Sequence, residues 1–172
     1  MLNIYINTWG NYNENGCDDG EWITLPMDAD ELEEKLNQVA ETMGDFDPEW
    51  FINDYEWTGD VSVREIGEHE NVYELNEYIQ KLDYMDEWEQ KTFCAAVEVF
   101  GEIDPDDLDE FQLYEDIEND YDLGYYWVND SGCYDLKNMG TLASYIDYES
   151  FGRDIRLESD GDFSSLGWIE RI

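Results

Sequence analysis

Residues 92–136 read TFCAAVEVFGEIDPDDLDEFQLYEDIENDYDLGYYWVNDSGCYDL and contain no Lys or Arg. The same stretch is rich in large apolar residues, among them Phe93, Phe100, Phe111 and Trp127, which supply enough apolar surface for a packed core. Disordered acidic tails lack such residues, so the stretch predicts a folded polyanion. Because like charges on a folded surface repel one another and reduce stability, we expect this charge to serve a role outside the fold.

The composition of the whole chain carries the same imbalance. The 172 residues include 46 Asp and Glu against 8 Lys and Arg, which gives a formal net charge of −38. Hydrophobic residues at 42% and aromatic residues at 16% are ample for burial. A protein this acidic avoids nucleic acids and anionic membranes and is attracted to basic clefts. We therefore exclude nucleic acid and membrane as partners and expect a basic one.

Several classes of site have no support in the sequence. The N-terminus has no secretory signal, and no run of about 18 apolar residues occurs, so we expect a soluble, cytoplasmic protein. Cys17, Cys94 and Cys133 are odd in number and widely spaced, which indicates neither a disulfide framework nor a zinc site. No phosphate-binding or dinucleotide-binding motif occurs, and His69 is the only histidine. We expect no catalytic residue, no metal and no cofactor.

Local patterns in residues 1–60 predict a small sheet with one helix. Asn, Gly and Asp dominate residues 10–20, which predicts a loop. A helix is expected to begin after Asp28, a good N-cap, and to stop at Gly44. Strands are predicted from alternation or aromatic composition in three segments: residues 2–7, 21–25 and 50–57.

Apolar residues recur at helical spacings in residues 61–103, which predicts a helical middle module. The residues that define its two helices are Val72, Leu75, Ile79 and Leu82, then Met85, Trp88, Ala95, Ala96, Val99 and Phe100.

Residues 104–172 predict an α+β C-terminal module, so the fold class of the chain is α+β in three small modules. The module opens with a third helix, in which Asp104 is the N-cap and Pro105 the first residue. We expect this helix to run as far as Ile117. Residues 121–128 fit either a helix or a strand. The other expected elements are a helix over residues 141–151 and strands near residues 155–157 and 167–172.

Two other functions remain open from the residues. Calcium prefers oxygen ligands, and Asn11, Asn13, Asn15 and Gly16 match early positions of an EF-hand loop. The last ligand position holds Trp22 instead of Glu, which argues against that motif. Carboxylate pairs suit a glycoside hydrolase, but an acidic chain contains such pairs by chance. An acidic calcium-binding module is therefore the main alternative, and a carboxylate-based hydrolase the second.

The physical interpretation of the polyanion is mimicry of a nucleic acid. Duplex DNA carries one charge per ~1.7 Å of axis, so a charge of −38 corresponds to about 19 base pairs. Helical carboxylates four residues apart, such as Asp106 with Glu110 or Glu98 with Glu102, would form rows of charge. The acids that we expect to act as phosphate surrogates lie in the second and third modules: Glu70, Glu74, Asp83, Glu98, Glu102, Asp104, Asp106, Asp107, Asp109, Glu110, Glu115, Asp116, Glu118, Asp120 and Asp122.

The C-terminal sequence resembles a known motif. Residues 142–154, LASYIDYESFGRD, resemble the antirestriction motif of the ArdA antirestriction proteins. The N-terminal sequence is similar to that family at IYI (4–6), YN (12–13) and GEWI (20–23), so the resemblance covers the whole chain.

The resemblance implies a dimeric protein of three modules in a curved rod that imitates bent B-form DNA. Such proteins occupy the DNA-binding groove of type I restriction–modification enzymes, in the methyltransferase core, and block restriction and often modification. They are non-catalytic, act in the bacterial host cell and are typically encoded on mobile genetic elements. The resemblance also implies that residues 121–128 are helical.

The motif itself has a structural interpretation. Helical spacing of its apolar residues predicts a core-forming helix that ends at Gly152 as the C-cap. We expect Arg153 to make an internal or intersubunit ion pair, so that its substitution disturbs assembly or folding. The motif residues are Leu142, Tyr145, Asp147, Tyr148, Glu149, Gly152, Arg153 and Asp154.

Overall fold

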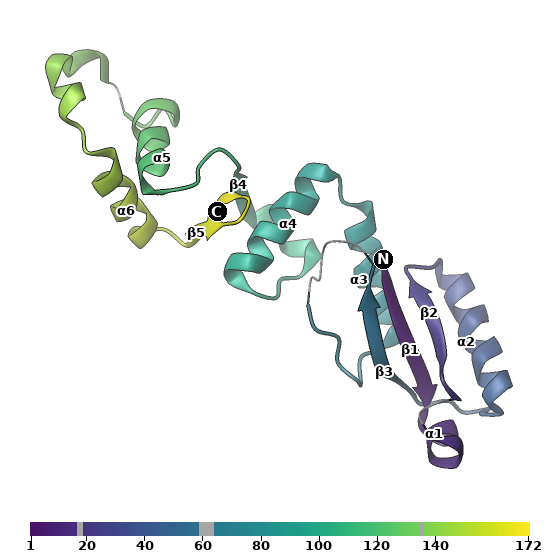
Figure 1. Ribbon diagram of the computed structural model, residues 1–172. Helices are drawn as coiled ribbons and strands as arrows, with labels where there is room; N and C mark the ends of the chain where they lie inside the picture. Colours follow the sequence, from purple (N-terminus) through teal and green to yellow (C-terminus); the bar gives the residue numbers. More distant parts are fainter. Residues whose placement is uncertain (17–18, 59–63, 135) are drawn as a thin grey trace. The chain divides into compact units, whose positions relative to one another are not determined.

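The computed structural model describes residues 1–16, 19–58, 64–134 and 136–172. They form two compact units, Met1–Met85 and Asp86–Ile172, and each unit contains a three-stranded antiparallel sheet with helices packed on it (Figure 1). The predicted α+β class is confirmed. The division between the two units, after Met85, falls inside the middle module expected over residues 61–103. The expected module boundaries near residues 60 and 103 stay a prediction.

The sheet of the first unit is built around the N-terminal strand. Strand β1 (Leu2–Thr8) lies between β2 (Glu21–Leu25) and β3 (Trp50–Trp57) and is antiparallel to both. The register between β1 and β3 shifts between Tyr5 and Ile6. All three predicted strands are therefore confirmed.

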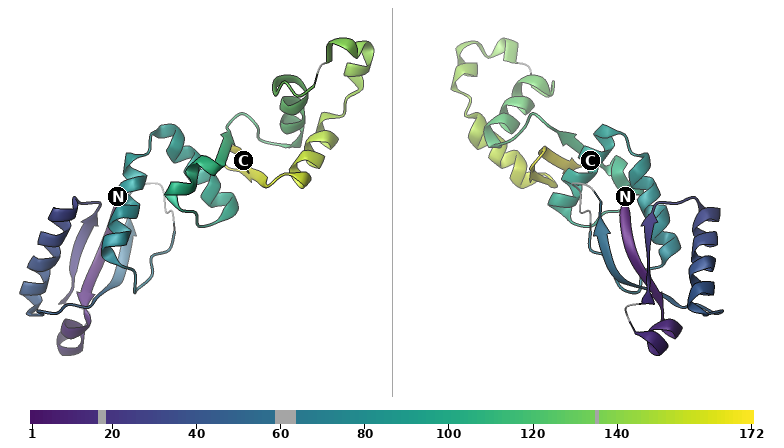
Figure 2. Two further views of the ribbon diagram at one scale, coloured as in Figure 1. Left: turned by 180° about the vertical axis from the view of Figure 1, so that it is seen from behind. Right: turned by 45° about the vertical axis from the view of Figure 1, so that its right-hand side comes forward.

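Two helices cover one face of this sheet (Figures 1 and 2). Leu2, Ile4 and Ile6 alternate along β1 and are fully buried, together with apolar residues of α2 (Ala29–Met43) and α3 (Val72–Tyr84). The predicted stop of α2 is confirmed, because Gly44 follows it in the left-handed conformation with φ 71°. Because α3 shares this core, it belongs to the first unit.

The predicted loop over residues 10–20 is wrong in its first half. Helix α1 (Trp9–Asn15) follows β1 directly, and the Thr8 hydroxyl accepts the Asn11 N–H at 3.1 Å as its N-cap. Asn11 donates to Asn7 at 2.9 Å, and Asn15 donates to Asn11 at 2.9 Å. Asparagine is usually a loop former, but this amide ladder at helical spacing stabilises a helix instead.

The second unit packs helix α4 (Glu87–Phe100) against a sheet with strand order β4-β6-β5. These strands are β4 (Phe111–Tyr114), β5 (Gly161–Ser164) and β6 (Gly167–Arg171). Their buried side chains include Trp168, which is fully buried. The predicted C-terminal strand near residues 167–172 is confirmed.

The third helix expected from Asp104 to Ile117 is wrong beyond its first turns. The Asp104 carboxylate caps the segment by accepting the Asp106 N–H, as predicted, but Pro105–Glu110 forms a 3-10 helix, η2. From Phe111 the chain is strand β4, which pairs with the C-terminal strand. That pairing partner is distant in sequence, so local patterns did not indicate it.

Two helices lie side by side at the other end of the second unit, as the views in Figures 1 and 2 show. Helix α5 (Asp120–Tyr125) continues into a π-helical turn, η3 (Tyr126–Asp130), so the helical alternative for residues 121–128 is confirmed. Short 3-10 helices η4 (Leu136–Asn138) and η5 (Gly140–Tyr145) then lead to α6 (Tyr148–Glu158).

Three predictions about α6 are wrong. The helix expected over residues 141–151 is broken, because the extended backbone at Ile146 separates η5 from α6, which begins after Asp147. Gly152 is not a C-cap but lies inside α6. The strand expected near residues 155–157 is the last part of the same helix.

Candidate functional site

The acids expected to act as phosphate surrogates lie at or near the protein surface. Twelve of the fifteen are exposed, and the three that are half-buried are Glu70, Asp120 and Asp122. Several occur in η2 and just after strand β4, where Asp107, Asp109, Asp116 and Glu118 are all exposed within a short length of chain. Carboxylates are thus displayed on solvent, as binding to a basic surface requires.

Neither of the two pairs expected to form rows of charge at a spacing of four residues lies on one α-helix. Glu98 lies on α4, but Gly101 ends that helix, so Glu102 lies beyond it. Asp106 and Glu110 belong to a 3-10 helix, which has three residues per turn, so acids three residues apart align instead. One such pair is Asp106 with Asp109.

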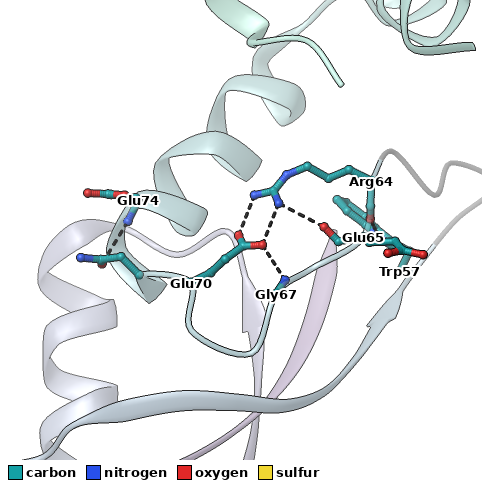
Figure 3. Close-up of polar contacts among 7 residues, drawn as sticks. Trp57, Arg64, Glu65, Gly67, Glu70 and Glu74 are labelled. Atoms are coloured by element: carbon teal, nitrogen blue, oxygen red, sulfur yellow. Dashed lines mark hydrogen bonds and ion pairs between the residues drawn. The ribbon is translucent and has the colours of Figure 1, made fainter. Parts of the chain in front are cut away.

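Glu70 is held by an intramolecular clamp (Figure 3). The Arg64 guanidinium donates to both carboxylate oxygens of Glu70, at 2.8 and 2.7 Å, and the Gly67 N–H donates at 2.6 Å. Partial burial alone would raise the pKa of Glu70, but these hydrogen bonds and the Arg64 charge lower it below its ordinary value. Glu70 therefore organises the segment before α3, and its carboxylate is already occupied.

Asp120 is held in the same way in the second unit. Arg156 of α6 donates to its two oxygens at 2.8 and 3.2 Å, and these hydrogen bonds lower the pKa of Asp120 below its ordinary value. The same interaction raises the pKa of Arg156. The pair joins the first residue of α5 to α6.

We expect Asp120→Asn to lower the free energy of unfolding by roughly 0.2–1 kcal/mol at neutral pH, the range for a partly exposed ion pair. Because the folded-state pKa is lowered, this contribution is complete above the ordinary value of 3.8 and disappears as the pH falls through the lowered pKa. Urea unfolding across an acid pH series should show that the free energies of unfolding of the wild type and of Asp120→Asn converge as the pH falls. Asp107→Asn, at an exposed acid of η2, is the matched control and should follow the wild type; a constant gap would contradict the assignment.

Other acids also have partners within the second unit. The Glu98 carboxylate accepts the Ser165 N–H at 2.9 Å and its hydroxyl at 2.7 Å, which fixes the β5–β6 turn to α4. Glu115 lies 2.8 Å from the Lys91 ammonium.

Several basic side chains form these same local contacts. Among the residues that the structure describes, ion pairs within the chain include Lys35–Glu21, Arg64–Glu70, Lys91–Glu115, Arg153–Asp154, Arg156–Asp120 and Arg171–Glu110. Each of these cations neutralises an acid of its own unit, and the 46 acids of the sequence far outnumber its 8 Lys and Arg residues. The uncompensated charge is therefore carried mainly by exposed carboxylates.

Helix α2 carries acids that the sequence-based choice of sites missed. Its buried stripe faces the sheet, and its opposite side is exposed and acidic. The helical period that identified the buried stripe also places these acids on the solvent face, so the signal was present. The exposed acids of α2 are Asp30, Glu31, Glu33, Glu34 and Glu41.

Gly152 of the motif lies where α6 crosses α5. A Cβ atom at Gly152 would lie 1.8 Å from the Asp120 carbonyl oxygen, and one at Gly124 would lie 1.9 Å from the Tyr148 carbonyl oxygen. Both distances are far below van der Waals contact. The two helices approach this closely because both positions are glycine.

The other motif residues divide into structural and exposed groups. The Asp147 carboxylate caps α6 by accepting the Ser150 N–H at 3.1 Å, which with the Ser150 hydroxyl lowers the pKa of Asp147. Tyr148 contacts the rings of Tyr121 and Tyr125 on α5. Glu149 is exposed.

The expectation that Leu142 and Tyr145 form a core is wrong. Leu142 is 65% exposed and Tyr145 is 82% exposed, because they belong to η5, which has no buried residue. Arg153 and Asp154 are also exposed and lie 3.9 Å apart, a geometry that contributes little to stability.

The described residues show no arrangement of three or more His, Cys, Asp or Glu side chains able to hold a metal ion. The Asn residues that resembled an EF-hand loop lie in α1, where Asn11 is buried and bonded to Asn7, Asn15 and the Asp19 carbonyl. Within the same described ranges, no helix is long and apolar enough to cross a membrane.

The fold and its surface define a class of small acidic α+β protein that displays carboxylates on its surface. A family model described as Antirestriction protein (ArdA) matches residues 4–170, so the chain belongs to the ArdA antirestriction family. Its function is accordingly antirestriction, directed against restriction–modification, and ArdA is a family of antirestriction proteins and not a known enzyme family. A search of curated proteins finds no match.

Proposed function

We propose that this protein inhibits type I restriction–modification enzymes as a non-catalytic mimic of bent B-form DNA. It occupies the DNA-binding groove of the methyltransferase core and so blocks restriction and modification. The observation that carries the proposal is the display of exposed carboxylates while Arg64, Lys91 and Arg156 are held by internal ion pairs. The protein would act in the cytoplasm of a bacterial host, where such enzymes meet incoming DNA.

A groove that binds DNA has to present Lys and Arg to two rows of phosphates. The same cations attract any surface with carboxylates in sufficient density, and steering by opposite charge raises the association rate. Among the acids expected to contact the groove, those without an internal partner are the better surrogates. Glu70 and Asp120 are the poorer ones, because Arg64 and Arg156 already satisfy their oxygens.

The test is competition between the protein and a labelled DNA duplex for a purified type I methyltransferase core. We expect displacement at low molar excess, and we expect the displacing power to fall as salt is raised, because binding between opposite charges is screened. Heparin serves as a generic polyanion control, and the folded protein should compete at a lower concentration of charge. Failure to displace DNA at every salt concentration would refute the mimicry.

We also propose that the protein acts as a homodimer. Two copies would present twice the number of carboxylates to one enzyme, and linked binding surfaces gain affinity when both engage the same target. The molar mass in solution, compared with 20.3 kDa for one chain, tests this directly.

A further inference from the structure

The sheet of the first unit has one face packed on helices and one face that reaches solvent. Helices α2 and α3 cover the first face, where the alternate residues Leu2, Ile4 and Ile6 of β1 are buried (Figures 1 and 2). Successive residues of a strand point to opposite faces, so the residues between them lie on the second face, together with their partners on β2 and β3. We call this second face the open face, and its residues are Asn3, Tyr5, Trp22, Thr24, Asp54 and Glu56.

The register of the sheet arranges the open face in two rows. Tyr5 lies opposite Trp22 on β2 and opposite Asp54 on β3, so the first row crosses all three strands. Neighbouring strands are about 4.8 Å apart, which brings the rings and the carboxylate of this row within the length of one long side chain. The residues of the second row are Thr24, Asn3 and Glu56.

The two rings of the first row are held in place. The centroids of the Tyr5 and Trp22 rings lie 5.2 Å apart, and their planes are tilted by 47°. The Tyr5 hydroxyl accepts the Gly20 N–H at 2.8 Å, and a Cβ atom at Gly20 would lie only 2.7 Å from the Tyr5 ring, so the backbone of Gly20 packs against it. Trp22 nevertheless remains 48% exposed. We call these two residues the aromatic platform.

We propose that the open face binds an arginine side chain of the basic partner. A guanidinium group is planar, stacks on aromatic faces and donates hydrogen bonds to carboxylates. The open face offers both kinds of contact, because the exposed carboxylates of Asp54 and Glu56 stand on the strand beyond Tyr5. Lysine is favoured less, since its ammonium group is more strongly hydrated and has no plane to stack. An anionic ligand would be repelled by the same carboxylates.

This inference rests on the proposed function and adds a contact that charge alone does not supply. Arginine side chains that bind DNA contact phosphates and also the bases, with which they can stack. In the protein, the carboxylates of the open face take the place of the phosphates, and the aromatic platform takes the place of a base. The open face would therefore select arginine within the basic groove of the restriction–modification enzyme.

The first test uses two peptides of equal charge, hexaarginine and hexalysine, added to the wild-type protein. The indole N–H signal of Trp22 is followed by NMR and is identified by its absence in Trp22→Phe. We expect this signal to reach its half-maximal shift at a hexaarginine concentration roughly 2-fold to 30-fold below that of hexalysine, the range for a cation–π contact. The indole of Trp88 is the control in the same spectrum, because Trp88 is 45% exposed and lies between Glu87 and Glu89. It should respond equally to both peptides.

The second test measures competition with DNA for the purified methyltransferase core. Trp22→Leu should compete roughly 2-fold to 30-fold less well than the wild type, whereas Trp22→Phe keeps an aromatic face and should retain most of the activity. Trp88→Leu is the matched control and should compete like the wild type. Circular dichroism and the melting temperature establish first that each variant is folded. The loss in Trp22→Leu should persist as salt rises, because a stacked contact at short range is screened less than exposed charges further apart.

The possible outcomes separate this inference from DNA mimicry. An equal response of the Trp22 indole to the two peptides would overturn the inference, whatever the enzyme assay gives. If the wild type displaces DNA and folded Trp22→Leu does so equally well, the open face does not contact the enzyme, and the inference fails while mimicry stands. If the wild type never displaces DNA but its Trp22 signal prefers hexaarginine, mimicry is refuted and the open face remains an arginine site.

Discussion

Replacing Gly152 with alanine is expected to lower the free energy of unfolding of the second unit by roughly 1–3 kcal/mol. The new Cβ would lie 1.8 Å from the Asp120 carbonyl oxygen, which belongs to the backbone of α5 and cannot rotate away. Overpacking of this kind typically costs ~1–3 kcal/mol and occasionally more. Glycine to alanine inside a helix ordinarily stabilises by roughly 0.5–1 kcal/mol. The sign of the effect therefore tests the helix crossing.

Urea unfolding followed by circular dichroism measures this change. Gly67→Ala is the control, because a Cβ there would meet its nearest atoms at 3.5 Å, an ordinary contact, and the N–H that binds Glu70 is retained. Gly124→Ala is expected to destabilise as Gly152→Ala does. Because the two glycines share one contact, the double variant should lose less than the sum of the single losses. A stabilised Gly152→Ala protein would show that α5 and α6 are not packed this closely.

The helix crossing gives the motif a physical role apart from any contact with the target. Gly152 allows the close approach, Asp147 caps α6, and Tyr148 packs its ring against two tyrosines of α5. Arg156, just beyond the motif, then joins the two helices through Asp120. Loss of antirestriction in a Gly152 variant would follow from lost folding, so activity should be compared at equal concentrations of folded protein.

Elements with strong local signals were predictable from the sequence. Alternating apolar residues predicted β1. Apolar residues at helical spacing predicted α2, and Gly44 marked the end of that helix. Asp104 was correctly identified as a cap because its carboxylate serves the next turn of the same segment. For α2 and the Asp104 cap, the interactions that define the element lie within a few residues, where sequence patterns report them directly. Strand β1 pairs with the distant β3, but the alternation of its buried residues was enough to predict it.

Elements set by distant contacts were not predictable in this way. Phe111 has helical spacing with its neighbours, but pairing with the C-terminal strand β6 makes it the start of β4. Gly152 looked like a helix stop because glycine often ends helices, whereas its actual constraint is the backbone of α5. A one-residue pattern cannot separate a capping glycine from a glycine required by a crossing helix.

The acidic site shows the same division. The large number of acids and the helical period of the apolar residues were enough to predict that most acids are exposed. The same helical period would also have identified the exposed acids of α2. The internal partners of Glu98 and Asp120 are Ser165 and Arg156, which lie 67 and 36 residues away along the chain. Only the folded structure identifies which carboxylates are already bonded. The choice of individual phosphate surrogates therefore stays a prediction for mutagenesis.

Neutralising a block of exposed acids is expected to have the largest effect on binding to the enzyme. A variant with Asp107, Asp109, Asp116 and Glu118 changed to the corresponding amides should compete with DNA roughly 5-fold to several hundred-fold less well. One exposed ion pair contributes ~0.2–1 kcal/mol, and four such contributions together reach roughly 1–4 kcal/mol. Each single amide variant should change competition by only about 1.4-fold to 5-fold for the same reason. The dependence of competition on salt should also become shallower in the block variant, because fewer charges are screened.

A matched variant separates charge from shape at the same four positions. Changing the three aspartates to glutamate and Glu118 to aspartate keeps every negative charge and alters only side-chain length. If distributed charge drives binding, this variant should compete nearly as well as the wild type. If it fails as badly as the amide variant, individual carboxylate geometry matters more than charge density. If instead one amide substitution alone abolishes competition, binding is concentrated at a hot spot and the distributed mimic is the wrong description.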